Sequence, residues 1–207
     1  KGDIQVLASQ VDYAAADYWK KNKNKIEKLS PVSFGLYQGM AVPSYVDIDS
    51  IEQLNANADK LGNRIIGIEP GSGLMSDANN VVKAYDIKLK LVEGSTSAMT
   101  AALKSAVDRK EWVAVTVWDP SWMTKKFDLK FLKDPKGVFP PLQGYYWIGH
   151  KGFAETNPRA RELMAGVYVP ITDITAMNAE VKDGKTMDEA IKGWIDSHTD
   201  LVNRWGN

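Results

Sequence analysis

The sequence has no cysteine, and this absence excludes disulfide bonds, thiolate metal sites and a cysteine nucleophile. It has only two histidines, His150 and His198, which do not have the spacing of metal ligands, so we expect no bound metal. No apolar run approaches the about 18 residues that indicate a transmembrane helix. The first residues, Lys1–Ile4, do not have the pattern of a signal peptide.

The sequence also lacks an excess of positive or negative charge. The 207 residues contain 26 Lys and Arg and 26 Asp and Glu, so the formal net charge is zero. Nucleic-acid-binding proteins usually have a basic excess, and anionic membranes attract polybasic segments, so the balance argues against both partners. Hydrophobic residues make up 44% of the chain, which is enough to form a globular core.

Apolar segments with the patterns of strands and helices alternate along the chain, which predicts an α/β fold with mainly parallel sheets. Ser50 is a candidate helix cap, and Gly62 a candidate helix end. The expected strands are 4–8, 33–42, 64–68, 89–92, 112–117, 127–132 and 145–148; the expected helices are 14–26, 50–61, from the glycine turn to 85, 97–110, 157–165, 171–182 and 186–204.

Ligands of parallel α/β sheets bind beyond the carboxyl ends of the strands, and two loops have that position. The first, Glu69–Leu74, contains Gly71-Ser72-Gly73 between a strand and a helix. Backbone N–H groups at such a turn can bind an anion such as a carboxylate. A plain tight turn is an equally good interpretation, because glycine often marks turns.

The second loop, Trp118–Trp122, places a large aromatic residue at the end of a strand. An exposed indole face attracts a quaternary ammonium, and Asp119 beside it would add charge attraction. The alternative for either tryptophan is packing between sheet and helix, which we favour for Trp122. In Tyr145-Tyr146-Trp147, strand alternation sends Tyr145 and Trp147 to one face and Tyr146 to the other, and one of these faces is expected to be core. Trp147 is a candidate wall of a ligand cage, with core packing as the favoured alternative.

No Gly-x-Ser-x-Gly motif is present, and no nucleophile and base pair has support from spacing. The position of Asp77 in the sequence indicates no pairing with another potential catalytic residue. We therefore expect no catalytic residues, no cofactor and no enzymatic activity.

Several motifs in their order resemble the substrate-binding proteins of glycine betaine and proline betaine ABC transporters. The resemblance covers nearly the whole chain and rests on these segments: 40–46, MAVPSYV; 65–75, IIGIEPGSGLM; 91–95, LVEGS; 115–123, VTVWDPSWM; and 129–137, LKFLKDPKG. It implies a two-lobe, type II periplasmic-binding-protein-like fold with the ligand between the lobes. The first lobe would be residues 1–45 and 140–207, and the second would be 46–139.

The resemblance also implies roles for single residues. Trp118 matches a wall of an aromatic cage, and the N–H groups of Gly73 and Leu74 match those that hold a carboxylate. Ser72 stands where some relatives have another cage tryptophan. The family pattern Trp-Leu-Pro followed by histidine is absent, because Val11 takes the tryptophan position and Asp12 and Tyr13 follow.

Tyr13 or Trp147 would then replace the missing wall, and Asp12 and Asp119 would favour a more cationic ligand. Family members have some 60–70 further residues before this point, which predicts that the chain is an N-terminal truncation with an incomplete first lobe.

The resemblance predicts a protein that binds an osmolyte and delivers it to an ABC permease with its ATPase. The candidate ligands are glycine betaine, proline betaine, choline, trimethylamine N-oxide and dimethylsulfoniopropionate. The expected location is the periplasm or the outer face of the cytoplasmic membrane, with membrane contact only through the permease. A ligand-sensing domain of a receptor or regulator is the alternative.

Overall fold

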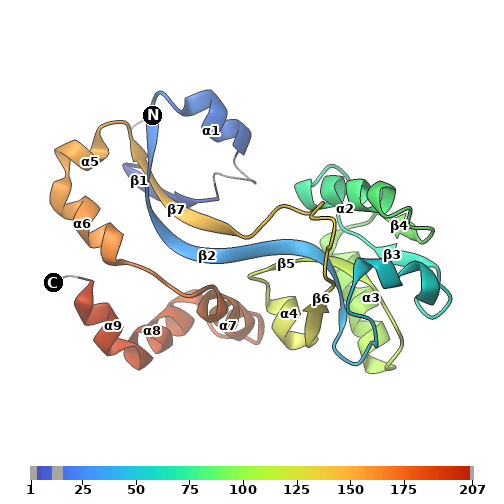
Figure 1. Cartoon of the computed structure of the whole chain (residues 1–207). Coiled ribbons are helices and arrows are strands. Elements are labelled where there is room, and N and C mark those ends of the chain that lie inside the picture. The colour runs from blue at the N-terminus through green and yellow to red at the C-terminus, as the bar shows by residue number, and fades with distance from the viewer. Residues whose placement is uncertain (1–3, 11–15, 206–207) are drawn as a thin grey trace. The chain divides into compact units, whose positions relative to one another are not determined.

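The computed structural model describes residues 4–10 and 16–205, which form two compact units (Figure 1). Unit 1 contains the chain up to Leu36 and again from Leu142, and unit 2 is Tyr37–Pro141. The border lies at 36/37 rather than at the predicted 45/46. The reason is strand β2, Ile26–Pro43, whose residues 37–43 pair with two strands of unit 2.

Unit 2 is built on a sheet with the strand order β2-β5-β3-β4, and β6 pairs with β2. The strands are β3 (Arg64–Ile66), β4 (Lys90–Val92), β5 (Val115–Asp119) and β6 (Leu129–Phe131). The helices are α2 (Gly73–Ala84), α3 (Thr96–Asp108) and α4 (Trp122–Lys126), with short 3₁₀ helices η1 (Ile51–Gln53) and η2 (Asn55–Asn57).

The sheet of unit 2 is mixed, which corrects the prediction of mainly parallel sheets. β3 is parallel to β4 and to β5, whereas β2 is antiparallel to β5 and to β6. Parallel neighbours need a crossover connection, and here α2 and α3 supply it for β3, β4 and β5. In the described part of unit 1, β1 (Val6–Ser9), β7 (Gln143–His150) and the first part of β2 pair only in antiparallel fashion.

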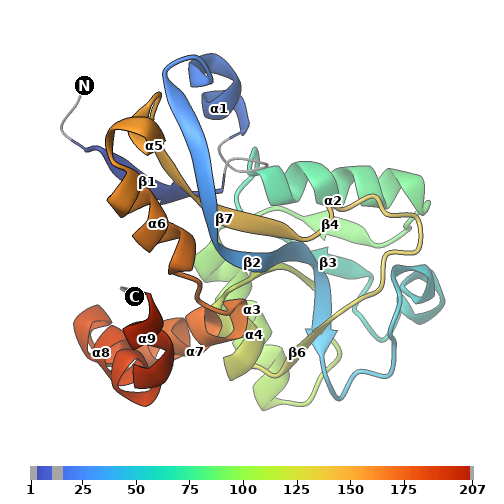
Figure 2. The same cartoon turned by 60° about the vertical axis from the view of Figure 1, so that its left-hand side comes forward.

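The two faces of the sheet in unit 2 have different helices. Thr116 Oγ1 lies 3.9 Å from Met75 Sδ of α2, so even-numbered residues of β5 face α2. Thr124 of α4 donates to Asp119, so the odd-numbered residues face α4, and Thr100 of α3 contacts Met123 of α4. Figures 1 and 2 show α2 on one side of these strands and α3 and α4 on the other.

The predicted helix 50–61 is replaced by η1 and η2, although Ser50 is the N-cap as predicted, in a capping box with Gln53. Asn55 explains the difference. Its amide bonds Asp86 O at 3.0 Å and its carbonyl accepts from Lys88 N at 2.8 Å, which ties this segment to the turn before β4. Such side-chain bonds to the backbone compete with a regular helix.

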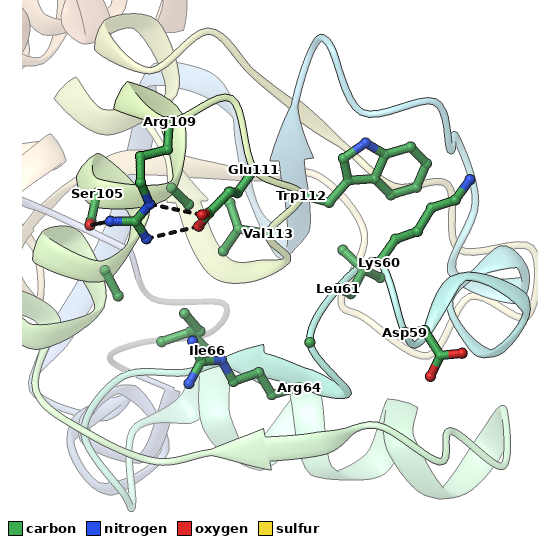
Figure 3. A pocket seen from close by; sticks show the side chains of 13 residues that line it. Asp59, Lys60, Leu61, Arg64, Ile66, Ser105, Arg109, Glu111, Trp112 and Val113 are labelled. Carbon is green, nitrogen blue, oxygen red and sulfur yellow. Dashed lines mark hydrogen bonds and ion pairs between the residues drawn. The ribbon is translucent and has the colours of Figure 1, made fainter.

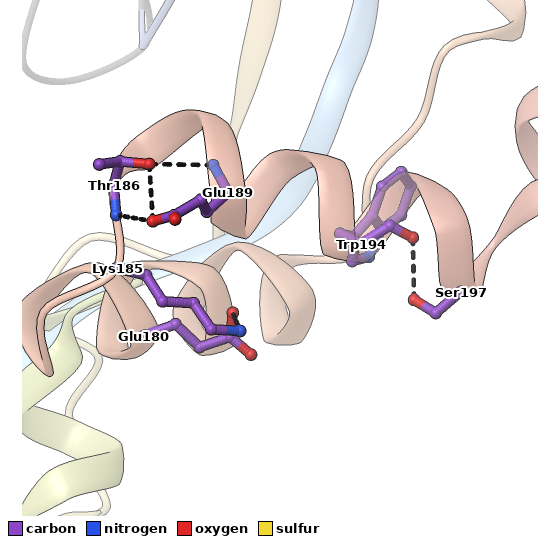
Figure 4. A network of polar contacts seen from close by, with 6 residues as sticks. All are labelled: Glu180, Lys185, Thr186, Glu189, Trp194 and Ser197. Atoms are coloured by element: carbon purple, nitrogen blue, oxygen red, sulfur yellow. Dashed lines mark hydrogen bonds and ion pairs between the residues drawn. The ribbon is translucent and has the colours of Figure 1, made fainter.

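The helices of unit 1 are α1 (Ala16–Asn22), α5 (Phe153–Thr156), α6 (Pro158–Gly166), α7 (Ile171–Lys182), α8 (Met187–Ser197) and α9 (Thr199–Arg204). α8 begins with a capping box between Thr186 and Glu189 (Figure 4). Trp194 of α8 donates to Asp173 of α7 at 2.9 Å. The predicted helix 186–204 breaks at His198, whose backbone leaves helical geometry. No helix in the described ranges is long and apolar enough to cross a membrane.

Apolar side chains are buried unevenly in the two units. The main cluster of buried apolar residues lies in unit 2, around Met40, Ile65, Met99 and Leu103. Among the described residues, the large apolar side chains that are exposed all lie in unit 1: Ile4, Leu7, Tyr18, Phe34, Leu142, Leu163, Tyr168, Met187, Ile191 and Ile195. The incompleteness of the first lobe stays a prediction.

Candidate ligand-binding site

The first predicted loop begins where β3 ends and leads into α2. Gly71 has φ +84°, the left-handed region that favours glycine, and Ser72 is the N-cap, with its hydroxyl accepting from Met75 N at 3.3 Å. Among the residues that the structure describes, none accepts a hydrogen bond from the N–H of Gly73 or Leu74. These two groups at the start of a twelve-residue helix can therefore bind an anionic ligand atom.

The first turn of α2 is fixed to the sheet by Met75. This side chain is 1% exposed, and its sulfur lies 3.4 Å from Ile68 N. A Cβ at Gly67 would lie 2.5 Å from the same sulfur, so this approach requires glycine at position 67. Gly67 therefore allows the close packing of Met75, in the first turn of α2, against the end of β3.

Trp118 lies at the end of β5 and is half-buried against the core of unit 2. It is two residues from Thr116, so its side chain is on the face that α2 covers. Trp118 and the first turn of α2 therefore share one face of the sheet. Trp122 also packs partly against the core, with its ring 5.8 Å from that of Phe127.

Asp119 does not accompany Trp118, contrary to our expectation. Strand alternation sends it to the opposite face, where its Oδ1 accepts from Thr124 Oγ1 at 2.8 Å and from Ser121 N at 3.4 Å. These bonds hold the start of α4, together with the N-cap bond in which Met123 N donates to Ser121 Oγ. Asp119 therefore stabilises a helix start on the far side of the sheet.

Asp77 is the carboxylate that the fold brings to the Trp118 face, and the sequence reasoning missed it. Its Oδ2 accepts from Gln38 Nε2 at 2.8 Å, and Gln38 is the direct cross-strand partner of Trp118. The partners of the hydrogen bond are 39 residues apart, so no local pattern predicts it. The sequence did contain one indication: Asp77 follows Gly73 by four residues, and residues four apart lie on the same face of a helix.

The remaining predicted site residues belong to unit 1. Asp12, Tyr13 and Val11 lie outside the described residues. Trp147 is on β7 opposite Ala8, and its buried Nε1 has no hydrogen-bond acceptor among the described residues. Tyr146 faces the other way, with Lys28 Nζ 3.6 Å from its ring centre.

A cavity of about 410 Å³ in unit 2 contains none of the predicted site residues (Figure 3). Arg64, the first residue of β3, lines it, so the cavity is at the opposite end of the strands from both loops. In it, Arg109 binds both oxygens of Glu111 at 2.8 Å, and Lys60 Nζ lies 4.6 Å from the Trp112 ring centre. The described residues include no group of three or more acidic or histidine side chains arranged for a metal ion.

Glu69 connects the first loop to α3. Its carboxylate accepts from Thr96 N at 2.8 Å and from Thr96 Oγ1 at 2.7 Å, and these bonds lower the pKa of Glu69 below its usual value. The negative charge of Glu69 should therefore stabilise the folded protein at pH values above the pKa of an unfolded Glu, which is about 4.3. This stabilisation should be lost as the pH falls through the lower pKa that Glu69 has in the folded protein.

We expect Glu69→Gln to be less stable than the parent protein at pH 7 and equally stable near pH 2. Urea unfolding at a series of pH values measures the difference, with Glu52→Gln as an exposed control. A difference that is the same at every pH would contradict the role of the Glu69 charge.

Comparisons with known proteins identify the family of the chain. A family model described as "Substrate binding domain of ABC-type glycine betaine transport system" matches residues 1–197. The crystal structure of lactococcal OpuAC, complexed with glycine betaine, is 33% identical with a TM-score of 0.79 and covers 100% of this chain and 81% of its own. The glycine betaine/proline betaine-binding protein ProX of Borrelia burgdorferi is 28% identical with a TM-score of 0.74, over 99% and 78%.

Among curated relatives, the glycine betaine/carnitine transport binding protein GbuC of Listeria monocytogenes is 37% identical over 150 residues, covering 71% of this chain and 50% of its own. The chain spans about half the length of the curated relatives it matches. The fold is the α/β type II periplasmic-binding-protein fold of the solved relatives, as predicted. The chain therefore belongs to the family of substrate-binding domains of ABC-type glycine betaine transport systems.

Proposed function

We propose that this protein binds a small quaternary-ammonium or related osmolyte and delivers it to an ABC importer, without catalysing a reaction. The observation that carries the proposal is the shared face of unit 2. There, Trp118 offers an indole face, and Gly73 and Leu74 offer two N–H groups without an acceptor in the described structure.

These two features suit the two ends of a betaine. An indole face attracts a quaternary ammonium by about 2 kcal/mol when water is excluded. A helix start binds a carboxylate through backbone N–H groups and the helix dipole. Lactococcal OpuAC is described with glycine betaine bound, and GbuC is named for glycine betaine and carnitine. We extend this ligand class to the present chain.

The partners and the location follow from the same proposal. The family serves ABC-type transport systems, so the ligand would pass to a permease driven by its ATPase. The protein would work in the periplasm or at the outer face of the cytoplasmic membrane and contact the membrane only through the permease.

Isothermal titration calorimetry tests the proposal with glycine betaine, proline betaine, choline, trimethylamine N-oxide and dimethylsulfoniopropionate, and with glycine as a control without N-methyl groups. We expect saturable binding of at least one methylated ligand and none of glycine. A folded protein that binds no member of the panel would contradict the proposal.

A further inference from the structure

The bond between Gln38 and Asp77 places a negative charge beside the candidate ligand site. Gln38 Nε2 donates to Asp77 Oδ2 at 2.8 Å, and both side chains are partly buried. A part-buried carboxylate in a specified hydrogen bond has a more defined position than an exposed one. The charge of Asp77 is therefore held by β2 and α2 together.

Two further relations show where this charge lies. Gln38 pairs directly with Trp118 across β2 and β5, and directly paired residues project to the same face with Cβ atoms about 5 Å apart. Asp77 also lies four residues after Gly73, and helical side chains lean toward the N-terminus, over the preceding turn. Asp77, Gln38 and Trp118 therefore lie on the same face of unit 2 as the first turn of α2.

A negative charge in this position acts differently on the two ends of a ligand. It attracts a quaternary ammonium on Trp118, and it repels a carboxylate at the N–H groups of Gly73 and Leu74. A hydroxyl in place of the carboxylate loses less, because it carries no charge. The same face thus combines a feature that binds anions with a charge that opposes them.

We propose that Asp77, held by Gln38, is a specificity-determining residue that biases this site toward quaternary-ammonium cations without a carboxylate, such as choline, relative to zwitterionic betaines. The inference rests on the proposed function and deepens it by naming the ligand's net charge as the selected property. Asp119 does not supply this charge on the Trp118 face, because its carboxylate holds the start of α4 on the other side of the sheet.

The test measures dissociation constants of choline and glycine betaine by calorimetry at low ionic strength. We expect Asp77→Asn, which keeps the shape of the side chain, to shift the ratio of the two constants by about tenfold in favour of glycine betaine. Asp77→Glu should keep the ratio within about twofold, because it keeps the charge. Thermal unfolding of each variant confirms that it is folded.

Asp108→Asn is the matched control, because it removes one exposed carboxylate from the far end of α3, where Asp108 pairs with Lys104. The ratio of the two dissociation constants in Asp108→Asn should equal that of the parent protein. If the parent protein binds both ligands and Asp77→Asn leaves the ratio of their dissociation constants unchanged, the inference is wrong and the proposed function stands. If the folded parent protein binds neither choline nor glycine betaine, the inference is wrong, whereas the proposed function is contradicted only if no ligand of the panel binds.

Discussion

Replacing Trp118 by alanine is expected to weaken the binding of a quaternary-ammonium ligand by about 30-fold, the factor that corresponds to a desolvated cation–π contact of about 2 kcal/mol. The reason is the half-buried position of Trp118 at the end of β5, on the face shared with the first turn of α2. The loss should be similar for every methylated cation, because the indole face attracts the charge and the methyl groups rather than the other end of the ligand. Calorimetry with glycine betaine and choline measures it.

Two variants make this experiment specific. Trp118→Phe keeps an aromatic face with a weaker attraction for cations, so its affinity should lie between those of the parent and the alanine variant. Trp112→Ala removes a tryptophan that contacts Lys60 in the cavity at the other end of the strands, and it should bind like the parent protein. Equal losses in Trp118→Ala and Trp112→Ala would show that loss of stability, not of a ligand contact, causes the effect.

Replacing Gly67 by alanine is expected to destabilise the protein by about 1–3 kcal/mol, the usual cost of overpacking a core. The new Cβ would lie 2.5 Å from Met75 Sδ and 3.1 Å from Val92 O, and Met75 is buried on all sides. The buried Met75 side chain must shift to relieve this clash, and a shift that passes to the first turn of α2 would lower ligand affinity as well. Urea unfolding and calorimetry measure the two effects.

A double-mutant cycle shows whether the clash is with Met75. Met75→Ala removes the sulfur, so the cost of Gly67→Ala should be smaller in the Met75→Ala background than in the parent protein. Gly193→Ala is the control, since its Cβ would meet no atom within 4 Å in α8 and should stabilise that helix. Additive costs of the Gly67 and Met75 substitutions would contradict direct contact.

Much of the fold is predictable because it depends on local patterns. The glycine turn before α2, the Ser50 cap and the end of the strand predicted over 33–42 are visible in a few consecutive residues each, and all three agree with the structure. Trp118 is a candidate because a large aromatic at a strand end is unusual in a plain core. Its role as a ligand contact stays a prediction.

The features that the sequence did not predict depend on contacts between distant segments. Strand β2 pairs with β5 in antiparallel fashion, and this pairing sets Gln38 opposite Trp118, which is 80 positions away in the chain. The partnership of Asp77 and Gln38 follows from that register. The error for Asp119 had a different cause: adjacency in sequence suggested that it lies beside Trp118, whereas adjacent residues of a strand point to opposite faces.

The division of the chain between the two units has a consequence for synthesis on the ribosome. Unit 2 is one uninterrupted segment, Tyr37–Pro141, and contains the main apolar core, whereas unit 1 needs strands from both sides of it. A nascent chain can therefore complete the unit that has Trp118 and the first turn of α2 while β7 is still untranslated. Until β7 emerges, β1 and the first part of β2 lack the strand that lies between them in the described structure.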